Sequence, residues 1–229
     1  MDSRKLYANN ENWYRHLRQG KRNYIMAKKI AIKGIGTKLQ CGLLDNNTIF
    51  NGANVPCIVL PLVENLEKIL LCILNSKLIT YYMRNICPKK LGGYYRFNSS
   101  NISSIPIILP ESSQQPFIAL ADKMLTLNES LQKKSTNFLK VVKQTFALEK
   151  ISTKLETFYN LDFDGFMKEL KQKVTPKTKL EWLEVFEETK KSLQEIQTQI
   201  VTTDKEINAL VYKLYDLTEE EIKIVEASH

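Results

Sequence analysis

The chain has 229 residues, 43% of them hydrophobic, so it can bury one large core or two small ones. Its net charge of +8 is uneven, because residues 1–110 contain 16 Lys and Arg against 5 Asp and Glu, whereas residues 111–229 contain 17 against 20. A concentrated positive half favours a polyanionic partner. The lack of an apolar run of about 18 residues argues against a membrane span, and the N-terminus lacks a signal-peptide core, so we expect a cytoplasmic protein.

Short β-branched runs separated by turn residues dominate the first part of the chain. Strands are predicted over residues 28–39, 39–44, 48–50 and 55–60, with Asn, Asp and Gly clusters between them. Residues 64–85 place apolar side chains at helical spacing, which predicts one helix. A second short helix is expected over residues 101–106, after the loop Gly92–Phe97. The first 110 residues are therefore predicted to form a small mixed α/β domain.

The pattern changes after Pro110, where residues 110–116 read as a linker rich in Pro, Ser and Gln. Apolar residues then recur at steps of four and three, which predicts a long helix with a coiled-coil-like seam. The apolar seam positions are Leu120, Met124, Leu127, Leu131, Phe138, Val141, Leu148 and Leu155. Further helices are predicted over residues 179–200, from an N-cap at Thr203-Asp204, and after a capping box at Thr218–Glu221. The overall fold class is thus predicted to be α+β, with a long-helix region over residues 111–229.

Motifs of the common catalytic sites are missing. The chain has no Asn-Pro or Asp-Pro for a methyltransferase loop, and the glycine pair in Gly34-Ile35-Gly36 has no third glycine. Its four cysteines lie 15 or 16 residues apart, so free thiols are expected rather than a zinc site. Asp164 with Glu169-Leu170-Lys171 has the letters of a metal-dependent nuclease, but this segment is predicted to be a helix. We therefore assign no catalytic residue, metal or cofactor to this chain.

Basic and aromatic side chains interleave in the first half, most densely around Gly92–Phe97. Arginine can read guanine, asparagine can read adenine, and lysine can neutralise phosphates. Flexible glycines beside stacking rings and a guanidinium suit nucleic-acid contact better than acid–base chemistry. The candidate DNA-binding residues are Tyr14, Arg15, Arg18, Lys21, Arg22, Lys28, Lys33, Lys38, Arg84, Lys89, Lys90, Tyr94, Tyr95, Arg96 and Asn98.

Several features occur in an order typical of one family. They are Trp13-Tyr14 with the basic run after it, Lys28–Ile32, Ile69–Leu78, Gly92–Phe97 before Ile102–Pro106, Leu120–Met124, and Asp204–Thr218. In this order the chain resembles the TaqI-like C-terminal specificity domain. That domain is the target recognition region of single-chain restriction-modification enzymes and related adenine DNA methyltransferases. The resemblance is expected to cover nearly the whole chain.

The resemblance implies a sequence-specific DNA recognition module that is not an enzyme by itself. Residues 1–110 would be the target-recognition domain, and residues 111–229 a helical bracing and docking region. The expected partners are double-stranded DNA and a methyltransferase or nuclease module, in the same or a neighbouring chain, which would use S-adenosylmethionine and magnesium. Two alternatives stay open: a helical assembly module without DNA affinity, for example a homodimer through the long helices, and a nuclease built on Asp164, Glu169 and Lys171.

Overall fold

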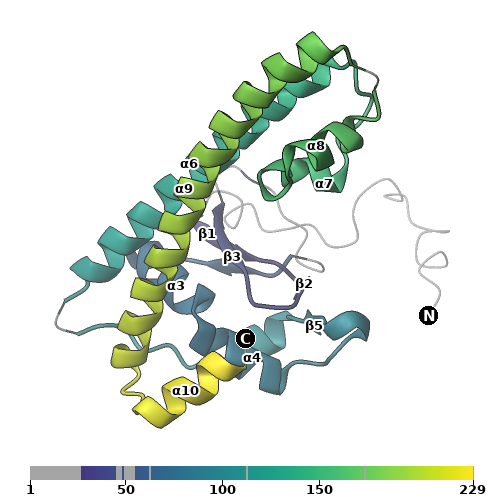
Figure 1. Ribbon diagram of the computed structural model, residues 1–229. Helices are drawn as coiled ribbons and strands as arrows, with labels where there is room; N and C mark the ends of the chain where they lie inside the picture. Colours follow the sequence, from purple (N-terminus) through teal and green to yellow (C-terminus); the bar gives the residue numbers. More distant parts are fainter. Residues whose placement is uncertain are drawn as a thin grey trace, which may run out of the picture. The chain divides into compact units, whose positions relative to one another are not determined.

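The computed structural model describes residues 27–44, 48, 55–61, 63–111, 113–172 and 174–228 (Figure 1). These residues divide by their contacts into two compact units. The first consists of the described residues of Met1–Glu67 with Met83–Ile105, and the second of Lys68–Tyr82 with Pro106–His229. Helices predominate and the sheets are small and antiparallel, so the predicted α+β class is confirmed.

The first unit contains two small sheets. In one, β1 (Lys29–Ile32) lies between β3 (Cys41–Leu44) and β4 (Cys57–Val59), antiparallel to both. In the other, β2 (Ile35–Gly36) pairs with β5 (Tyr95–Arg96). The strand predictions over residues 28–39, 39–44 and 55–60 are confirmed in outline. The predicted strand over residues 48–50 lies largely outside the described residues.

The core of the first unit forms where alternate side chains of the strands turn inward. Ile30 and Ile32 are fully buried, as expected for two residues on one face of β1. Phe97 follows β5 and is 1% exposed, so it anchors the end of that strand. The short helix α5 (Ser99–Ser103) adds the buried Ile102, which confirms the predicted helix with a start two residues earlier.

The helix predicted over residues 64–85 is divided in two by Ser76. It forms α3 (Leu66–Asn75) and α4 (Lys77–Ile86). The Ser76 hydroxyl donates a hydrogen bond to the Ile73 carbonyl at 2.7 Å and accepts one from the Ile79 backbone N–H at 3.3 Å. One buried side chain thus serves the end of one helix and the start of the next. The apolar spacing gave no sign of this break, because both helices bury residues at similar intervals.

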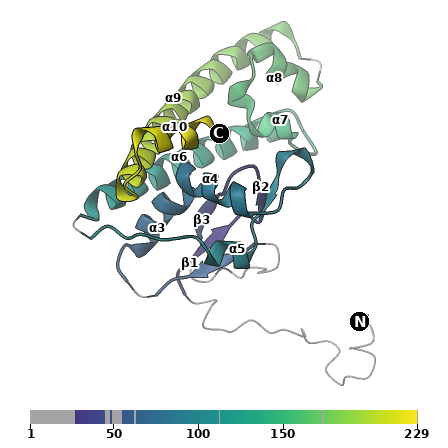
Figure 2. The ribbon, with the colours of Figure 1, turned by 90° about the horizontal axis from the view of Figure 1, so that it is seen from below.

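Two long antiparallel helices, α6 (Gln115–Thr145) and α9 (Pro176–Leu214), form most of the second unit. They lie side by side in both ribbon views (Figures 1 and 2). A compact connection joins them, made of α7 (Thr153–Glu156), the 3₁₀ turn η2 (Phe158–Asn160) and α8 (Phe163–Leu170). A proline in the first turn of each long helix occupies a position where a missing N–H costs no intrahelical hydrogen bond.

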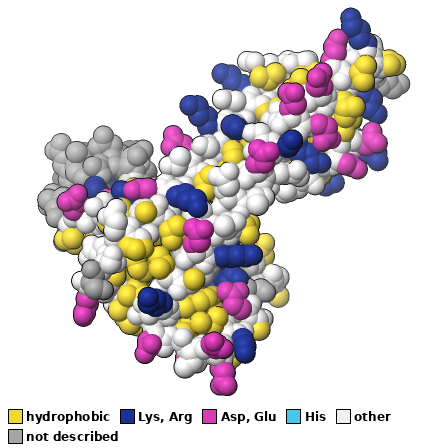
Figure 3. Space-filling view, turned by 60° about the vertical axis from the view of Figure 1, so that its left-hand side comes forward, with side chains coloured by type: hydrophobic (Ala, Val, Ile, Leu, Met, Phe, Trp, Pro, Cys, Tyr) yellow, Lys and Arg dark blue, Asp and Glu magenta, His cyan; other side chains and the backbone are white. Residues whose placement is uncertain are grey.

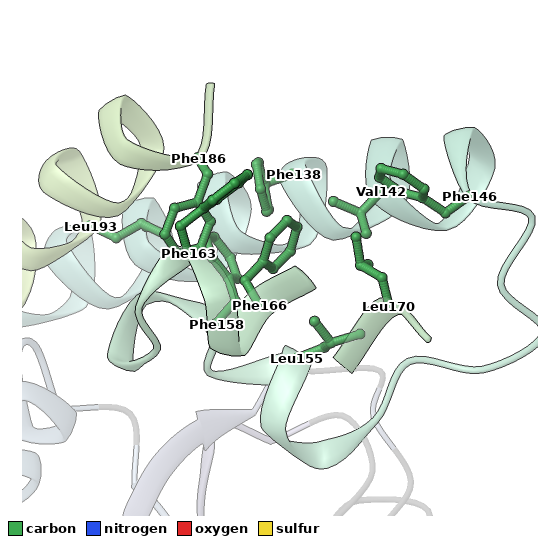
Figure 4. Close-up of a cluster of buried hydrophobic side chains, with 10 residues drawn as sticks. All are labelled: Phe138, Val142, Phe146, Leu155, Phe158, Phe163, Phe166, Leu170, Phe186 and Leu193. Atoms are coloured by element: carbon green, nitrogen blue, oxygen red, sulfur yellow. The ribbon is translucent and has the colours of Figure 1, made fainter. Parts of the chain in front are cut away.

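Apolar side chains from all these elements, most of them aromatic, fill the space between the long helices and the connection (Figure 4). Phe158 stacks on Phe138 with ring centroids 4.2 Å apart, and Phe166 stacks on Phe186 at 4.8 Å. Phe158, Phe166 and Phe186 are all fully buried. This cluster therefore holds η2 and α8 against both long helices.

The first seam positions, Leu120 to Leu131, lie in α6 and are half-buried, whereas the last ones do not fit the predicted helix. Helix α6 stops at Thr145, so Leu148 and Leu155 lie outside it. Val141 is 52% exposed, whereas Val142 is fully buried. The buried positions Phe138, Val142 and Phe146 follow steps of four, and they pack into the cluster that α6 forms with α9 and the connection.

The predicted N-cap at Thr203-Asp204 is wrong, because α9 continues through it without a break. The buried Thr203 hydroxyl donates to the Gln199 carbonyl one turn earlier, at 2.8 Å, which satisfies the side chain inside a helix. The last predicted helix is confirmed as α10 (Glu219–Ala227), with a complete capping box between Thr218 and Glu221.

Residues 68–82 are tied to the helical part of the second unit by polar contacts. The Lys77 backbone N–H donates to Asn208 Oδ1 at 2.7 Å, and the Cys72 thiol donates to the Phe117 carbonyl at 3.5 Å. Lys68 pairs with Asp122 at 2.8 Å. In the part of the chain that the structure describes, no helix is both long and apolar enough to span a bilayer.

Candidate nucleic-acid interface

The segment Pro88–Phe97, here called the ribbon arm, is a tightly hydrogen-bonded excursion of the first unit. Lys89 and Tyr95 form an antiparallel bridge, and the Lys90 N–H donates to the Tyr94 carbonyl at 2.7 Å. The Arg96 N–H donates to the Pro88 carbonyl at 3.2 Å. The arm is therefore a closed hairpin and not the flexible loop that its glycines suggest in the sequence.

Two glycines form the tip of this hairpin. Gly92 and Gly93 have φ values of 76° and 77°, a left-handed conformation that other residues adopt at a cost. A Cβ atom on Gly92 would also lie 3.4 Å from the Tyr94 ring. The pair therefore reverses the chain within the 3₁₀ turn η1 (Leu91–Gly93).

The base of the ribbon arm is fixed to β2. Ile35 pairs with Arg96 and Gly36 with Tyr95, and the Phe97 N–H donates to the Gly34 carbonyl at 2.8 Å. This pairing brings the segment around Lys33 and Lys38 alongside the arm. Two stretches of basic sequence that lie about 60 residues apart thus meet in one ribbon.

Arg84 braces this ribbon from the end of α4. Its Nε and Nη2 atoms donate to the Thr37 carbonyl at 2.9 and 2.7 Å, and its guanidinium lies over the Tyr95 ring, 5.9 Å from the centroid. One side chain thus connects the turn after β2 to β5. Sequence reasoning had no signal for the role of Thr37, because it contributes only a backbone carbonyl.

The exposed side of the ribbon is strongly cationic. Residues 27–44 and 83–105 contain eight Lys and Arg and no Asp or Glu. Lys33, Lys38, Lys89, Lys90 and Arg96 are all exposed. Lys33 donates to the amide oxygen of Gln40 at 3.2 Å, and none of the five forms an ion pair with another described residue. Their charge is therefore available to an external anion.

Other candidate residues have partners within the protein. Lys28 pairs with Glu67 at 2.9 Å, and the neighbouring Lys29 is fully buried and donates to the Ala27 carbonyl at 3.0 Å. Asn98 caps α5, where its Oδ1 accepts from the Asn101 N–H at 2.9 Å. Tyr94 is 46% exposed and Tyr95 is half-buried. The candidates Tyr14, Arg15, Arg18, Lys21 and Arg22 lie outside the described residues.

The second unit shows no comparable excess of one charge. On the face shown in Figure 3, Lys and Arg side chains are interspersed with Asp and Glu over the helices. Mixed charge of this kind is typical of a solvated helical surface. The electrostatic contrast between the two halves of the sequence is thus present on the surface as well.

The three residues of the nuclease hypothesis, Asp164, Glu169 and Lys171, do not form one site. Asp164 pairs with Lys179 at 3.1 Å, whereas Glu169 binds Ser152 at 2.9 Å and Lys154 at 3.2 Å. The Ser152 hydrogen bond, with help from Lys154, lowers the pKa of Glu169. A hollow of about 490 Å³ is lined by Asp164 and Lys171 but not by Glu169. No group of metal-ligating side chains occurs among the described residues.

The cysteines have the properties of structural thiols. None of the four forms a disulfide, with Cys72 and Cys87 buried and Cys41 and Cys57 half-buried. Burial raises the pKa of Cys41 and of Cys72 to about 12. Because the thiolate is the reactive form, neither group is a nucleophile at neutral pH.

Comparison with known families divides the chain in two. Residues 3–107 match the family described as TaqI-like C-terminal specificity domain, and residues 110–211 match one described as Domain of unknown function (DUF8810). A search of curated proteins found no match. The first match is shorter than the near-complete coverage expected from the sequence, since it ends before α6. It contains the whole ribbon arm, and residues 3–107 of this chain are therefore a TaqI-like C-terminal specificity domain.

Proposed function

We propose that this chain recognises a specific DNA sequence for a restriction-modification system and has no catalytic activity of its own. The observation that carries the proposal is the ribbon arm with β2. It is an acid-free, exposed cationic ribbon within the residues that match a specificity domain. A protein surface of this kind fits the phosphate backbone of a nucleic acid.

Binding would use two kinds of contact. Lys33, Lys38 and Lys89 would neutralise phosphates and set the position of the duplex, without reading its sequence. Arg96 and Tyr94 are exposed on the arm, where they would reach base edges in a groove. Arg84 and Asn98 would act indirectly, because their side chains hold the ribbon and α5 in place.

Catalysis would come from a separate methyltransferase or nuclease module, in the same or a neighbouring chain. That module would supply the sites for S-adenosylmethionine and magnesium. Residues 111–229 would then brace residues 1–110 and dock the catalytic part, in the cytoplasm. The mixed charge of the long helices supports a role other than direct DNA contact for this region.

The first test is binding of duplex DNA at two salt concentrations. We expect clear binding at 50 mM salt and a loss of roughly 100-fold or more at 200 mM, because several phosphates would be neutralised. The measurement is fluorescence anisotropy with a labelled duplex. No binding at the lower salt concentration would contradict the proposal.

A second test separates reading from anchoring. Arg96→Ala is expected to weaken binding to a selected high-affinity duplex by about 10-fold or more, but to weaken binding to random duplex only slightly. Lys89→Gln, its matched control on the same arm, should weaken both duplexes by similar factors. Equal losses on both duplexes for Arg96→Ala would remove it from the reading role.

The alternative is an assembly module that works through the long helices. Assembly would require apolar side chains on the outer surface of the long helices. Val141 of α6 and Val201 of α9 are such side chains, because they are 52% and 55% exposed. Light scattering distinguishes the two functions, since a stable oligomer without DNA affinity favours assembly. A monomer that binds duplex DNA favours the recognition module.

A further inference from the structure

The tip of the ribbon arm presents a leucine with almost no protein contact. Leu91 is 97% exposed, whereas Leu180 and Ile224, also among the exposed large hydrophobic residues of the described chain, are 71% and 56% exposed. Single exposed leucines are common on proteins and need no explanation by themselves. Leu91 differs in its position, because it lies at the end of a hydrogen-bonded hairpin between Lys89-Lys90 and the two left-handed glycines.

The surroundings of Leu91 leave it without a neighbour to fold onto. Gly92 and Gly93 carry no side chains, and nothing lies within 4 Å of the position that a Cβ atom on Gly93 would take. The arm that carries it is closed by the Lys89–Tyr95 bridge and fixed by the buried Phe97. These contacts hold the backbone of the arm, which reduces the entropy that the arm would lose when it binds a partner.

The charge around the tip selects the kind of partner. A leucine that contacts another protein normally lies in a contiguous apolar patch from which lysine is depleted. Leu91 is instead flanked by Lys89 and Lys90, with Arg96 on the same arm and no acid anywhere in residues 83–105. An apolar side chain at the end of a narrow cationic projection matches duplex DNA, where apolar wedges enter between base steps and cations hold the adjacent phosphates.

We propose that Leu91 inserts between two adjacent base pairs of bound duplex DNA and unstacks them. This inference rests on the proposed function, because it requires the ribbon arm to lie in a groove. Lys89 and Lys90 would hold the phosphates beside the opened step, and the glycines would let the backbone of the tip approach the DNA closely. Unstacking would favour sequences with weakly stacked steps, which adds selectivity without a hydrogen bond to a base.

The experiment uses the full chain and a duplex selected by it from a randomised pool. 2-Aminopurine, whose fluorescence rises when it is unstacked, replaces one base at a time along the selected duplex. With the unaltered chain we expect a rise of several-fold at one or two adjacent positions. Leu91→Ala should abolish most of this rise and weaken binding by about 10-fold, because the apolar contact inside the stack is lost.

Two further variants control for size and for general effects. Leu91→Met keeps a long apolar side chain and should retain at least half of the fluorescence rise. Leu180→Ala removes an exposed leucine from α9 and should behave as the unaltered chain. Because Leu91 makes so few contacts, thermal unfolding of Leu91→Ala should match that of the unaltered chain, so a loss of signal cannot come from misfolding.

The outcomes separate this inference from the proposed function. If no duplex is enriched from the pool, both fail together. If a duplex is bound tightly but no position shows a fluorescence rise, only the wedge is overturned. If Leu91→Ala leaves affinity and fluorescence unchanged, the wedge is also overturned, and a protein partner becomes the better explanation for the exposed tip.

Discussion

Arg84 shows how a candidate DNA-binding side chain can act from inside the protein. Its guanidinium donates twice to the Thr37 carbonyl and lies over the Tyr95 ring, so it joins the turn after β2 to β5. Charged hydrogen bonds to a backbone carbonyl contribute more than neutral ones, although partial exposure reduces the gain. The residue therefore stabilises the arm that carries Tyr94 and Arg96.

We expect Arg84→Ala to lower the free energy of unfolding by about 1 kcal/mol, because the Thr37 carbonyl loses both donors. It should also weaken binding to every duplex, since the arm is no longer held against β2. Urea unfolding and anisotropy measure the two effects. The exposed Lys38→Ala is the matched control, which should leave stability within about 0.5 kcal/mol. Unchanged stability in Arg84→Ala would show that the brace has no effect.

The sequence predicted which residues are cationic but not which of them are already engaged. Lys28, Lys33 and Arg96 all lie in stretches of sequence without a nearby acid. Only the fold shows that Lys28 meets Glu67, 39 residues away, whereas Arg96 extends from the arm without an ion pair to a described residue. Leu91 was missed for a related reason, although an isolated apolar residue between two lysines and two glycines is a visible signal.

At the scale of elements, the turn of the ribbon arm depends on backbone conformation more than on side chains. Gly93→Ala forces a residue with a Cβ atom into φ near 77°, although space for the atom is available. We expect a loss of about 1 kcal/mol in stability and weaker DNA binding. Gly42→Ala is the matched control, because Gly42 lies in β3 with open space around it and no positive φ.

For this pair, hydrogen exchange of the Lys90 amide reports the arm directly, because that N–H closes the hairpin. Faster exchange in Gly93→Ala with unchanged exchange in Gly42→Ala is the expected result. Equal exchange rates in both variants would show that the left-handed turn is not what keeps the arm closed.

The capping box of α10 predicts a local pH dependence. The backbone N–H and the hydroxyl of Thr218 both donate to the Glu221 carboxylate. These bonds, the backbone one more than the hydroxyl one, lower the pKa of Glu221 below its ordinary value of 4.5. The ionised Glu221 carboxylate therefore stabilises α10 fully above pH 4.5. This stabilisation is lost as the pH falls through the lowered pKa of Glu221. Amide exchange in the first turn of α10 should accelerate on that acidification. Glu221→Gln should remove the pH dependence, and its persistence would exclude this carboxylate as the source.

The helical elements show where sequence periodicity is reliable and where it fails. The capping box predicted α10, and the apolar spacing predicted that a long helix follows the linker, although α6 begins five residues before the first predicted seam position. The sequence patterns failed at Ser76, where one hydroxyl divides a helix, and at Thr203, where a residue that resembles a cap is satisfied by the previous turn. Both failures come from hydrogen bonds of a single hydroxyl group, which an apolar pattern does not contain.

At the scale of the whole molecule, the excess of positive charge and the aromatic core cluster lie in different units. Residues 27–44 and 83–105 of the first unit contain Lys and Arg but no acid, whereas the second unit has mixed charge and the cluster around Phe138, Phe158 and Phe186. The cluster could be predicted as apolar stripes, but not as a connection packed against two antiparallel helices. Its assembly depends on contacts between residues up to 44 positions apart, such as Phe138 and Trp182, which local spacing does not encode.

Phe186→Ala tests this separation. Removing a fully buried ring that stacks on Phe166 should lower the stability of the second unit by about 4 kcal/mol. Affinity for the selected duplex, measured at low temperature where the chain stays folded, should change by less than about 2-fold. Glu187→Ala, on the exposed side of the same helix, is the control for stability. A parallel loss of DNA affinity in Phe186→Ala would show that recognition depends on the helical unit.

Residues 68–82 lie within the family match but belong to the second compact unit. This affects which exchanges of sequence between related proteins would preserve the fold. The family match ends at residue 107, yet this segment packs with α6, α9 and α10 through Cys72, Lys68 and Lys77. A chimaera joined near residue 110 would bring a foreign segment 68–82 against helices that did not evolve with it. An exchange limited to the ribbon arm, from Pro88 to Phe97, would keep those contacts. If the ribbon arm reads DNA as proposed, the recognised sequence would be easier to change by replacing this short hairpin than by replacing the complete domain.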